Sequence, residues 1–132
     1  MTAKQTQIDY WQASAKDNLT VAELLFKNKH YDSCLFFCHL TMEKMLKGLV
    51  VQATKQTAPY IHDLDRLAIL AKLQPTTVQR NHLKIMTGFN LAGRYAEEKN
   101  AFYKVSTKPY TKQYLSISKQ LFLWLAKQYQ KK

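Results

Sequence analysis

The segment YDSCLFFCHLTMEKMLKGLVV, residues 31–51, contains the pattern that decides the fold of this chain. Read at a helical period, one side of it is apolar: Tyr31, Cys34, Leu35, Cys38, Met42, Met45, Leu46 and Leu49. The opposite side is polar: Asp32, Glu43, Lys44 and Lys47. Phe36, Phe37 and Leu40 widen the apolar side. We therefore predict a central amphipathic helix that packs against more than one neighbour and also supplies a subunit contact.

Amphipathic segments on both sides of this helix predict further helices. The helices expected in chain order are residues 7–27, 31–51, 64–72, 76–91 and 111–130. Pro59 marks a loop after the second helix, Asp63 caps the third and Gly93 follows the fourth. In the fourth helix the side chains expected to point inward are Val78, Ile85, Met86 and Phe89. The short polar connection after residue 27 makes the first two helices antiparallel.

The composition agrees with one helical domain. The 132 residues are 46% hydrophobic and include only 3 Gly and 3 Pro, which favours long helices over a turn-rich β fold. We predict an all-α, up-and-down antiparallel bundle of four to five helices that forms a single domain over residues 1–132. The polar N-terminal residues predict neither a signal peptide nor a membrane span, so a cytoplasmic location is expected.

The charge balance indicates a polyanionic partner, whereas the residues expected of several enzyme classes are missing. Lys and Arg number 20 against 9 Asp and Glu, a net charge of +11 that attracts nucleic acid, nucleotides or acidic proteins. No Glu-x-x-His pair, HExxH motif or glycine fingerprint is present, so neither a metal nor a cofactor is predicted. Cys34 and Cys38 are spaced four apart, which suits buried core thiols better than a disulfide.

Ionisable residues at one edge of the central helix are the first candidates for a site. His39, Glu43 and Lys47 recur every four residues and therefore line one edge of its apolar side. His39 is expected to be either a partly buried histidine whose hydrogen bonds are satisfied or a catalytic residue. His62 precedes the expected start of the third helix, where bracing of the loop and chemistry are both open.

A basic and aromatic stretch, residues 94–112, is the second candidate. Its sequence is RYAEEKNAFYKVSTKPYTK, and it shows the least regular periodicity in the chain. Lys99, Lys104, Lys108 and Lys112 alternate with Phe102, Tyr103 and Tyr110. This mixture of cations and stacking surfaces is typical of single-stranded nucleic-acid grooves, and equally of a solvated basic loop whose rings pack against the bundle.

Together these motifs resemble the HEPN family of small helical domains, over about residues 8–124. The matching features, in order, are Trp11, the apolar run around Ala22 and Leu25, Tyr31, Phe37-x-His39, Met42-Glu43-Lys44, Lys47, His62-Asp63-Leu64 and Arg94-Tyr95. The resemblance implies a helical bundle that dimerises and is often encoded beside a minimal nucleotidyltransferase, as a toxin–antitoxin-like pair. It also implies that the protein is either a ribonuclease or a module that binds nucleotide or RNA.

The chain departs from the ribonuclease members at one position. Those members carry an Arg, then four to six intervening residues, then a His, but here the corresponding positions are Lys99, Asn100 and Ala101. An Asn amide orients or stabilises a substrate and does not shuttle protons as a His does. The resemblance therefore favours a module that binds phosphates in a basic groove, with a metal-independent endoribonuclease using Arg94 and a substitute base, His39 or His62, as the alternative.

The candidate residues follow from these two hypotheses, a binding module and an endoribonuclease. For catalysis the candidates are Arg94, Asn100 and His39. For nucleotide or RNA binding the candidates are Arg94, Tyr95, Glu43, Lys47, His62, Lys104 and Lys108. The expected partners are a second copy of the chain, a nucleotidyltransferase, and a nucleotide or RNA; no membrane is expected.

Overall fold

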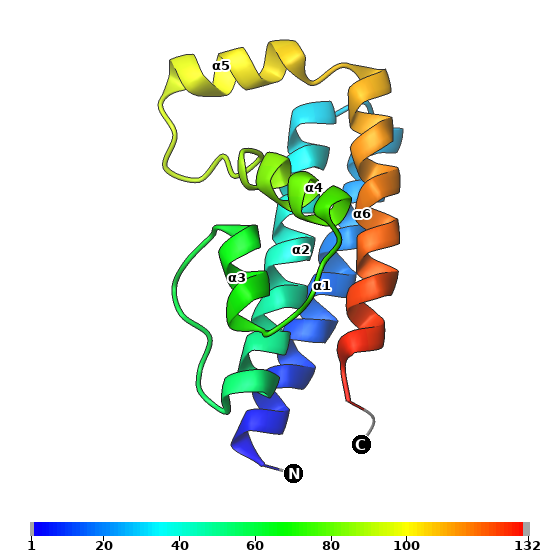
Figure 1. The fold of residues 1–132 in the computed structure, drawn as a ribbon. Helices are drawn as coiled ribbons and strands as arrows, with labels where there is room; N and C mark the ends of the chain where they lie inside the picture. Colours follow the sequence, from blue (N-terminus) through cyan, green and yellow to red (C-terminus); the bar gives the residue numbers. More distant parts are fainter. Residues whose placement is uncertain (1, 131–132) are drawn as a thin grey trace.

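The computed structural model describes residues 2–130 and confirms the all-α class (Figure 1). It has six helices in that range, not the four to five predicted, because the stretch after Arg94 forms a helix of its own. They are α1 (Ala3–Lys27), α2 (Tyr31–Thr54), α3 (Leu64–Leu70), α4 (Thr77–Thr87), α5 (Ala96–Val105) and α6 (Lys108–Gln128). The long helices α1, α2 and α6 run beside one another, and α3 and α4 pack on α2. None of the helices described is long and apolar enough to cross a membrane.

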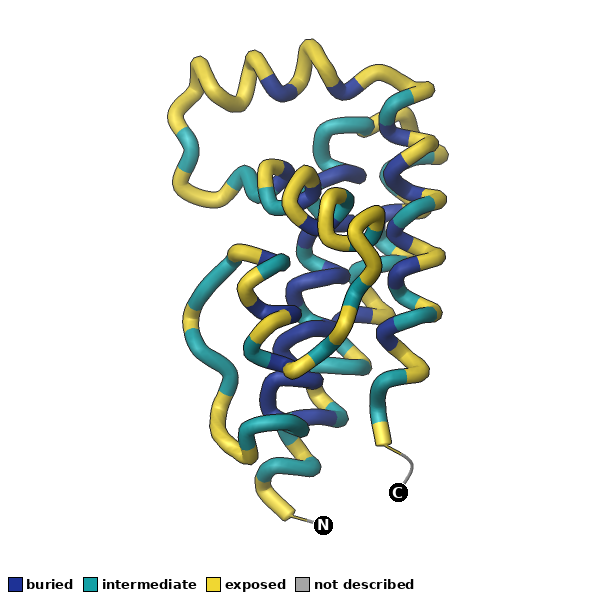
Figure 2. The backbone as a smooth tube through the Cα atoms, viewed as in Figure 1, coloured by how far each residue is buried: buried dark blue, intermediate teal, exposed yellow. Residues whose placement is uncertain are grey.

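Helix α2 is the centre of the core, as the apolar pattern of residues 31–51 predicts. It packs against α1, α3, α4 and α6, and Figure 2 shows its buried residues along most of its length. Cys34 and Cys38 are both fully buried as free thiols, and Leu35, Met42 and Leu46 are fully buried beside them. A helix apolar over this much of its circumference is stable because neighbouring helices cover most of its apolar surface.

Helix α4 differs from its prediction in both its end and its inward face. It ends at Thr87, not near Leu91, and the chain turns at Gly88 so that Phe89 reaches the core. Its buried residues are Leu83 and Met86, which are three apart. Val78 and Ile85 were expected to point inward but are 63% and 45% exposed. Ile85 lies about 200° around the helix from Leu83, so both cannot face α2.

Helix α5 lies where the sequence pattern predicts an irregular stretch. It extends to one side at the end of the bundle, and nearly all of its surface is exposed (Figures 1 and 2). Only Phe102 is buried in it, with its ring 5.7 Å from that of Phe89. One buried residue in ten produces no apolar stripe, which explains why periodicity misses this helix. Helix α6 accordingly begins at Lys108, capped by Thr107, and not at residue 111.

Candidate functional site

A buried carboxylate on α2 collects the ionisable residues of the central helix and one residue from the loop that precedes α3. Glu43 is only 6% exposed. Its Oε2 atom lies 3.2 Å from Lys47 Nζ, and its Oε1 atom lies 2.7 Å from His62 Nδ1. His39 Nε2 is 3.7 Å from Oε1. The structure therefore brings together four predicted site residues, three from α2 by helical spacing and His62 by the path of the loop.

His39 has a structural position within this cluster. It is fully buried, and its Nε2 atom lies 3.1 Å from the His62 carbonyl oxygen. Because a carbonyl only accepts, Nε2 carries the proton and donates it to that oxygen. Burial lowers the pKa of His39, which favours the neutral ring. His39 thus holds the loop against α2 and is not accessible to a substrate.

His62 has a more chemically useful environment. Its Nδ1 atom donates to the Glu43 carboxylate at 2.7 Å, whereas 40% of its side chain is exposed. The ring also packs edge-on against Tyr60, with centroids 5.1 Å apart. With Nδ1 engaged, Nε2 makes no hydrogen bond to the described residues and is the nitrogen available to a ligand. An imidazole oriented by a buried carboxylate is the arrangement that catalytic bases and anion-binding histidines use.

Lys47 is covered and paired, not presented to solvent. It is 5% exposed, and its Nζ atom lies 5.6 Å from the ring centroids of both Trp11 and Tyr60. Its ammonium is neutralised by Glu43 and shielded by two aromatic rings. Neither aromatic partner was among the predicted site residues. Trp11 lies on α1 and Tyr60 in a loop, so no spacing in the sequence connects them to Lys47.

Arg94 is held at the end of α4, whose last residue is hydrogen-bonded to the start of α3. Its guanidinium donates from Nη2 to the Gly88 carbonyl oxygen at 2.6 Å, at the end of α4. The preceding residue, Thr87, accepts a hydrogen bond at Oγ1 from the backbone N–H of Leu64 at 3.0 Å. This bond joins the end of α4 to the start of α3, two residues after His62. Arg94 and His62 therefore flank one helix–helix contact, and Figure 1 shows both connections on the same side of the bundle.

The other predicted site residues lie along α5 and beyond it. Tyr95 is 75% exposed at the start of α5, and Asn100 is exposed in its middle. Lys104 and Lys108 are exposed at the far end. The ten residues of α5 span roughly 15 Å at 1.5 Å per residue. The candidate residues thus do not form one pocket; they follow a line from His62 past Arg94 and along α5.

This arrangement defines a small all-helical module with a partly exposed His–Glu pair and, apart from it, a helix with exposed lysines and tyrosines. The described residues contain no group of metal-ligating side chains that could hold an ion. The HEPN domain model matches residues 8–129, so the chain belongs to the HEPN family. That membership supports a function connected with nucleotides or RNA in general.

A solved structure shares the fold. The crystal structure of TT1696 from Thermus thermophilus superimposes with a TM-score of 0.76 at 17% sequence identity. The match covers 93% of this chain and 98% of that chain. At this identity the likeness concerns the fold alone. No curated protein gives a significant match.

Proposed function

We propose that the chain is a HEPN module that binds nucleotide or RNA phosphates on the line from His62 and Arg94 to Lys104 and Lys108. The observation that carries this proposal is the His62 imidazole, held by the buried Glu43 at 2.7 Å with its second nitrogen free for a ligand. Arg94 adds a cation at the end of α4, which is hydrogen-bonded to the start of α3. A guanidinium donates to phosphate oxygens, and an imidazole whose Nδ1–H is held by a carboxylate donates from Nε2 when it carries its second proton.

Helix α5 extends this site with the features of a single-stranded nucleic-acid surface. Lys99, Lys104 and Lys108 are exposed, so their charges are available to phosphates. Tyr95 and Tyr103 are 75% and 64% exposed and offer stacking faces for bases. Phe102 alone turns inward and anchors the helix. A net charge of +11 adds long-range attraction for such a ligand.

Binding of RNA should depend strongly on salt. Replacing Lys104 and Lys108 with Gln is expected to lower the slope of log affinity against log salt by about one to two units, since each lysine neutralises about one phosphate. Fluorescence anisotropy with a labelled single-stranded RNA at several salt concentrations measures the slope. The control replaces Lys16 and Lys127, which change the net charge equally. An unchanged slope in the Lys104/Lys108 variant would place the RNA elsewhere, on the Lys112 and Lys119 side of α6.

The alternative function is a metal-independent endoribonuclease, and the structure favours His62 over His39 as its substitute base. A neutral His62 accepts the 2′-hydroxyl proton at Nε2 while that oxygen attacks the adjacent phosphorus. The 5′ oxygen leaves and takes a proton from solvent, which yields a cyclic phosphate. Arg94 offsets the charge that develops on the phosphate. His39 is unsuited to this role because it is fully buried and donates to the loop.

Incubation with RNA in excess EDTA separates the two functions. We expect the natural protein to leave RNA intact and the Asn100→His variant to cleave it, because that substitution restores the proton carrier of the family. His62→Gln is assayed beside them because it removes the substitute base of the alternative function. Equal cleavage by the natural protein and Asn100→His would contradict the binding module, and loss of that cleavage in His62→Gln would establish the alternative.

We further propose that the chain acts as a homodimer, with a nucleotidyltransferase as partner in a toxin–antitoxin-like pair. Leu40, Glu43 and Lys47 share one face of α2. The loop before α3 covers Glu43 and Lys47 but leaves Leu40 and Phe36 half-buried, which supports a contact between copies. The partner rests on the family resemblance, and a cytoplasmic location suits both roles.

Light scattering tests the dimer directly. At micromolar concentration we expect twice the 15.4 kDa chain mass, because an exposed apolar patch is stabilised when two copies cover it. Leu40→Glu is expected to yield the single-chain mass, since a buried carboxylate opposes association. A monomer at these concentrations for the natural protein would count against the dimer.

A further inference from the structure

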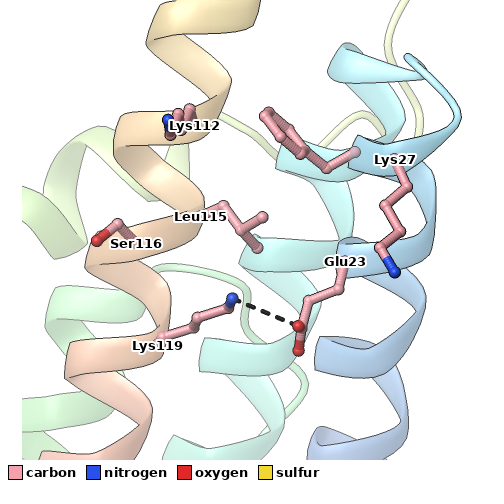
Figure 3. Close-up of a pocket in the computed structure, with 7 residues that line it drawn as sticks. Glu23, Lys27, Lys112, Leu115, Ser116 and Lys119 are labelled. Atoms are coloured by element: carbon pink, nitrogen blue, oxygen red, sulfur yellow. Dashed lines mark ion pairs between the residues drawn. The ribbon is translucent and has the colours of Figure 1, made fainter.

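A second basic site lies between α1 and α6, on the side of the bundle away from the loop that carries His62 (Figures 1 and 3). A cavity of about 290 Å³ opens there. Its rim carries three lysines, Lys27, Lys112 and Lys119, and one carboxylate, Glu23. None of these residues belongs to the line from His62 to Lys108, so the cavity is not explained by the proposed function.

The cavity is built by regular spacing on two helices. Lys112, Ser116 and Lys119 are four and three residues apart and share one face of α6. Glu23 and Lys27 are four apart on α1; Figure 3 shows the Glu23 carboxylate directed toward α6 and the Lys27 ammonium farther from it. Figure 3 shows Lys119 reaching across to α1, where its Nζ atom lies 3.3 Å from Glu23 Oε2. Both side chains of this ion pair are about half exposed, at 48% and 47%.

The floor of the cavity is apolar, unlike its rim. Leu115 is 7% exposed, and Phe26 packs partly buried against the same core. A ligand that fills the cavity must therefore place an apolar or aromatic group on Phe26 and Leu115 and a negative charge on the lysines. An inorganic anion satisfies only the rim, and a neutral aromatic compound satisfies only the floor.

We propose that this cavity binds a phosphate monoester carried on a nucleoside, either a free nucleoside monophosphate or the 5′ end of an RNA. Three ammonium groups and one carboxylate leave a local charge of about +2, which matches the charge of about −1.5 to −2 on a phosphate monoester at neutral pH. The phosphate takes the place of Glu23 at Lys119 and gains Lys112, while the base lies on the floor. The Ser116 hydroxyl provides a further donor.

Calorimetry with AMP at low salt tests the site. Lys119→Gln or Lys112→Gln should weaken AMP binding by about tenfold or more, the effect of one charge-assisted hydrogen bond. Glu23→Gln should strengthen it by about threefold to tenfold, because the competing carboxylate is removed. Lys127→Gln, in the last turn of α6 and outside the cavity, is the control and should change little. Adenosine and inorganic phosphate should each bind more weakly than AMP.

Several outcomes would overturn the proposal. These are undetectable AMP binding at millimolar concentration, weaker binding in Glu23→Gln, and equal losses in Lys127→Gln and Lys119→Gln. Loss of AMP binding in Arg94→Ala would move the phosphate to the other site and would also overturn it. RNAs with a 5′-phosphate or a 5′-hydroxyl identify the source. A preference for the 5′-phosphate that disappears in Lys119→Gln supports the RNA end as the ligand. AMP binding with no such preference among the RNAs supports the free nucleotide.

Discussion

Glu43→Ala is expected to lower the free energy of unfolding by about 3–5 kcal/mol, the cost of removing one partner of a buried ion pair. Lys47 is only 5% exposed, and the substitution removes the carboxylate oxygen that lies 3.2 Å from its Nζ atom. It also removes the acceptor that holds His62. Thermal denaturation followed by circular dichroism should show a melting temperature lower by roughly 10–20 °C for a chain of this length.

Two variants make this result specific to the buried pair. Glu23→Ala breaks the half-exposed ion pair with Lys119 and should cost no more than about 0.5 kcal/mol. The double substitution Glu43→Leu with Lys47→Met should recover most of the lost stability, because an apolar pair of similar volume removes both buried charges. If Glu43→Ala melts within a few degrees of Glu23→Ala, the cluster does not anchor the loop.

Arg94→Ala is expected to weaken RNA binding by roughly tenfold to a hundredfold at low salt, the loss of a charge-assisted contact to phosphate. Its effect on stability should be small. The guanidinium is partly exposed and makes one hydrogen bond to the Gly88 carbonyl, so about 1 kcal/mol is lost and the melting temperature stays within a few degrees. Fluorescence anisotropy and thermal denaturation on the same samples measure both quantities.

Arg80 provides the matched control. It is an exposed arginine on α4 whose guanidinium is already paired with a carboxylate, that of Asp65, at 3.2 Å, and it is not one of the candidate site residues. Arg80→Ala should leave RNA affinity within about twofold, since the Arg80 charge is already offset by Asp65. An equal loss of affinity in both variants would reduce the role of Arg94 to net charge. A fall in stability above about 3 kcal/mol for Arg94→Ala would instead indicate a structural arginine.

The helices with a broad apolar side could be predicted from the sequence because their signal is local. Residues 31–51 specify α2 by a repeat along the chain, and Asp63 and Thr76 mark helix starts through hydrogen bonds to residues three positions later. Helix α5 lacks such a repeat. It is held by Phe102 against Phe89, and that contact exists only once the chain has folded.

The candidate site divides in the same way. The cluster of His39, Glu43 and Lys47 follows from a repeat of four residues on one helix. Which histidine is available for chemistry does not follow from that repeat. Both histidines lie near Glu43. The loop places His62 against the carboxylate with part of its side chain in solvent, whereas His39 is buried and donates to the His62 backbone carbonyl.

By itself, the sequence determined the helical class, the central position of α2, the burial of its two cysteines, and the resemblance to the HEPN family. These properties depend on the order and period of side chains along the chain. The tertiary structure alone decided that Lys47 packs between Trp11 and Tyr60, that Arg94 donates to the carbonyl at the end of α4, and that three lysines line a cavity between α1 and α6. Each of these joins residues from different helices or loops, and their distances are set by how the helices pack, which no local pattern encodes.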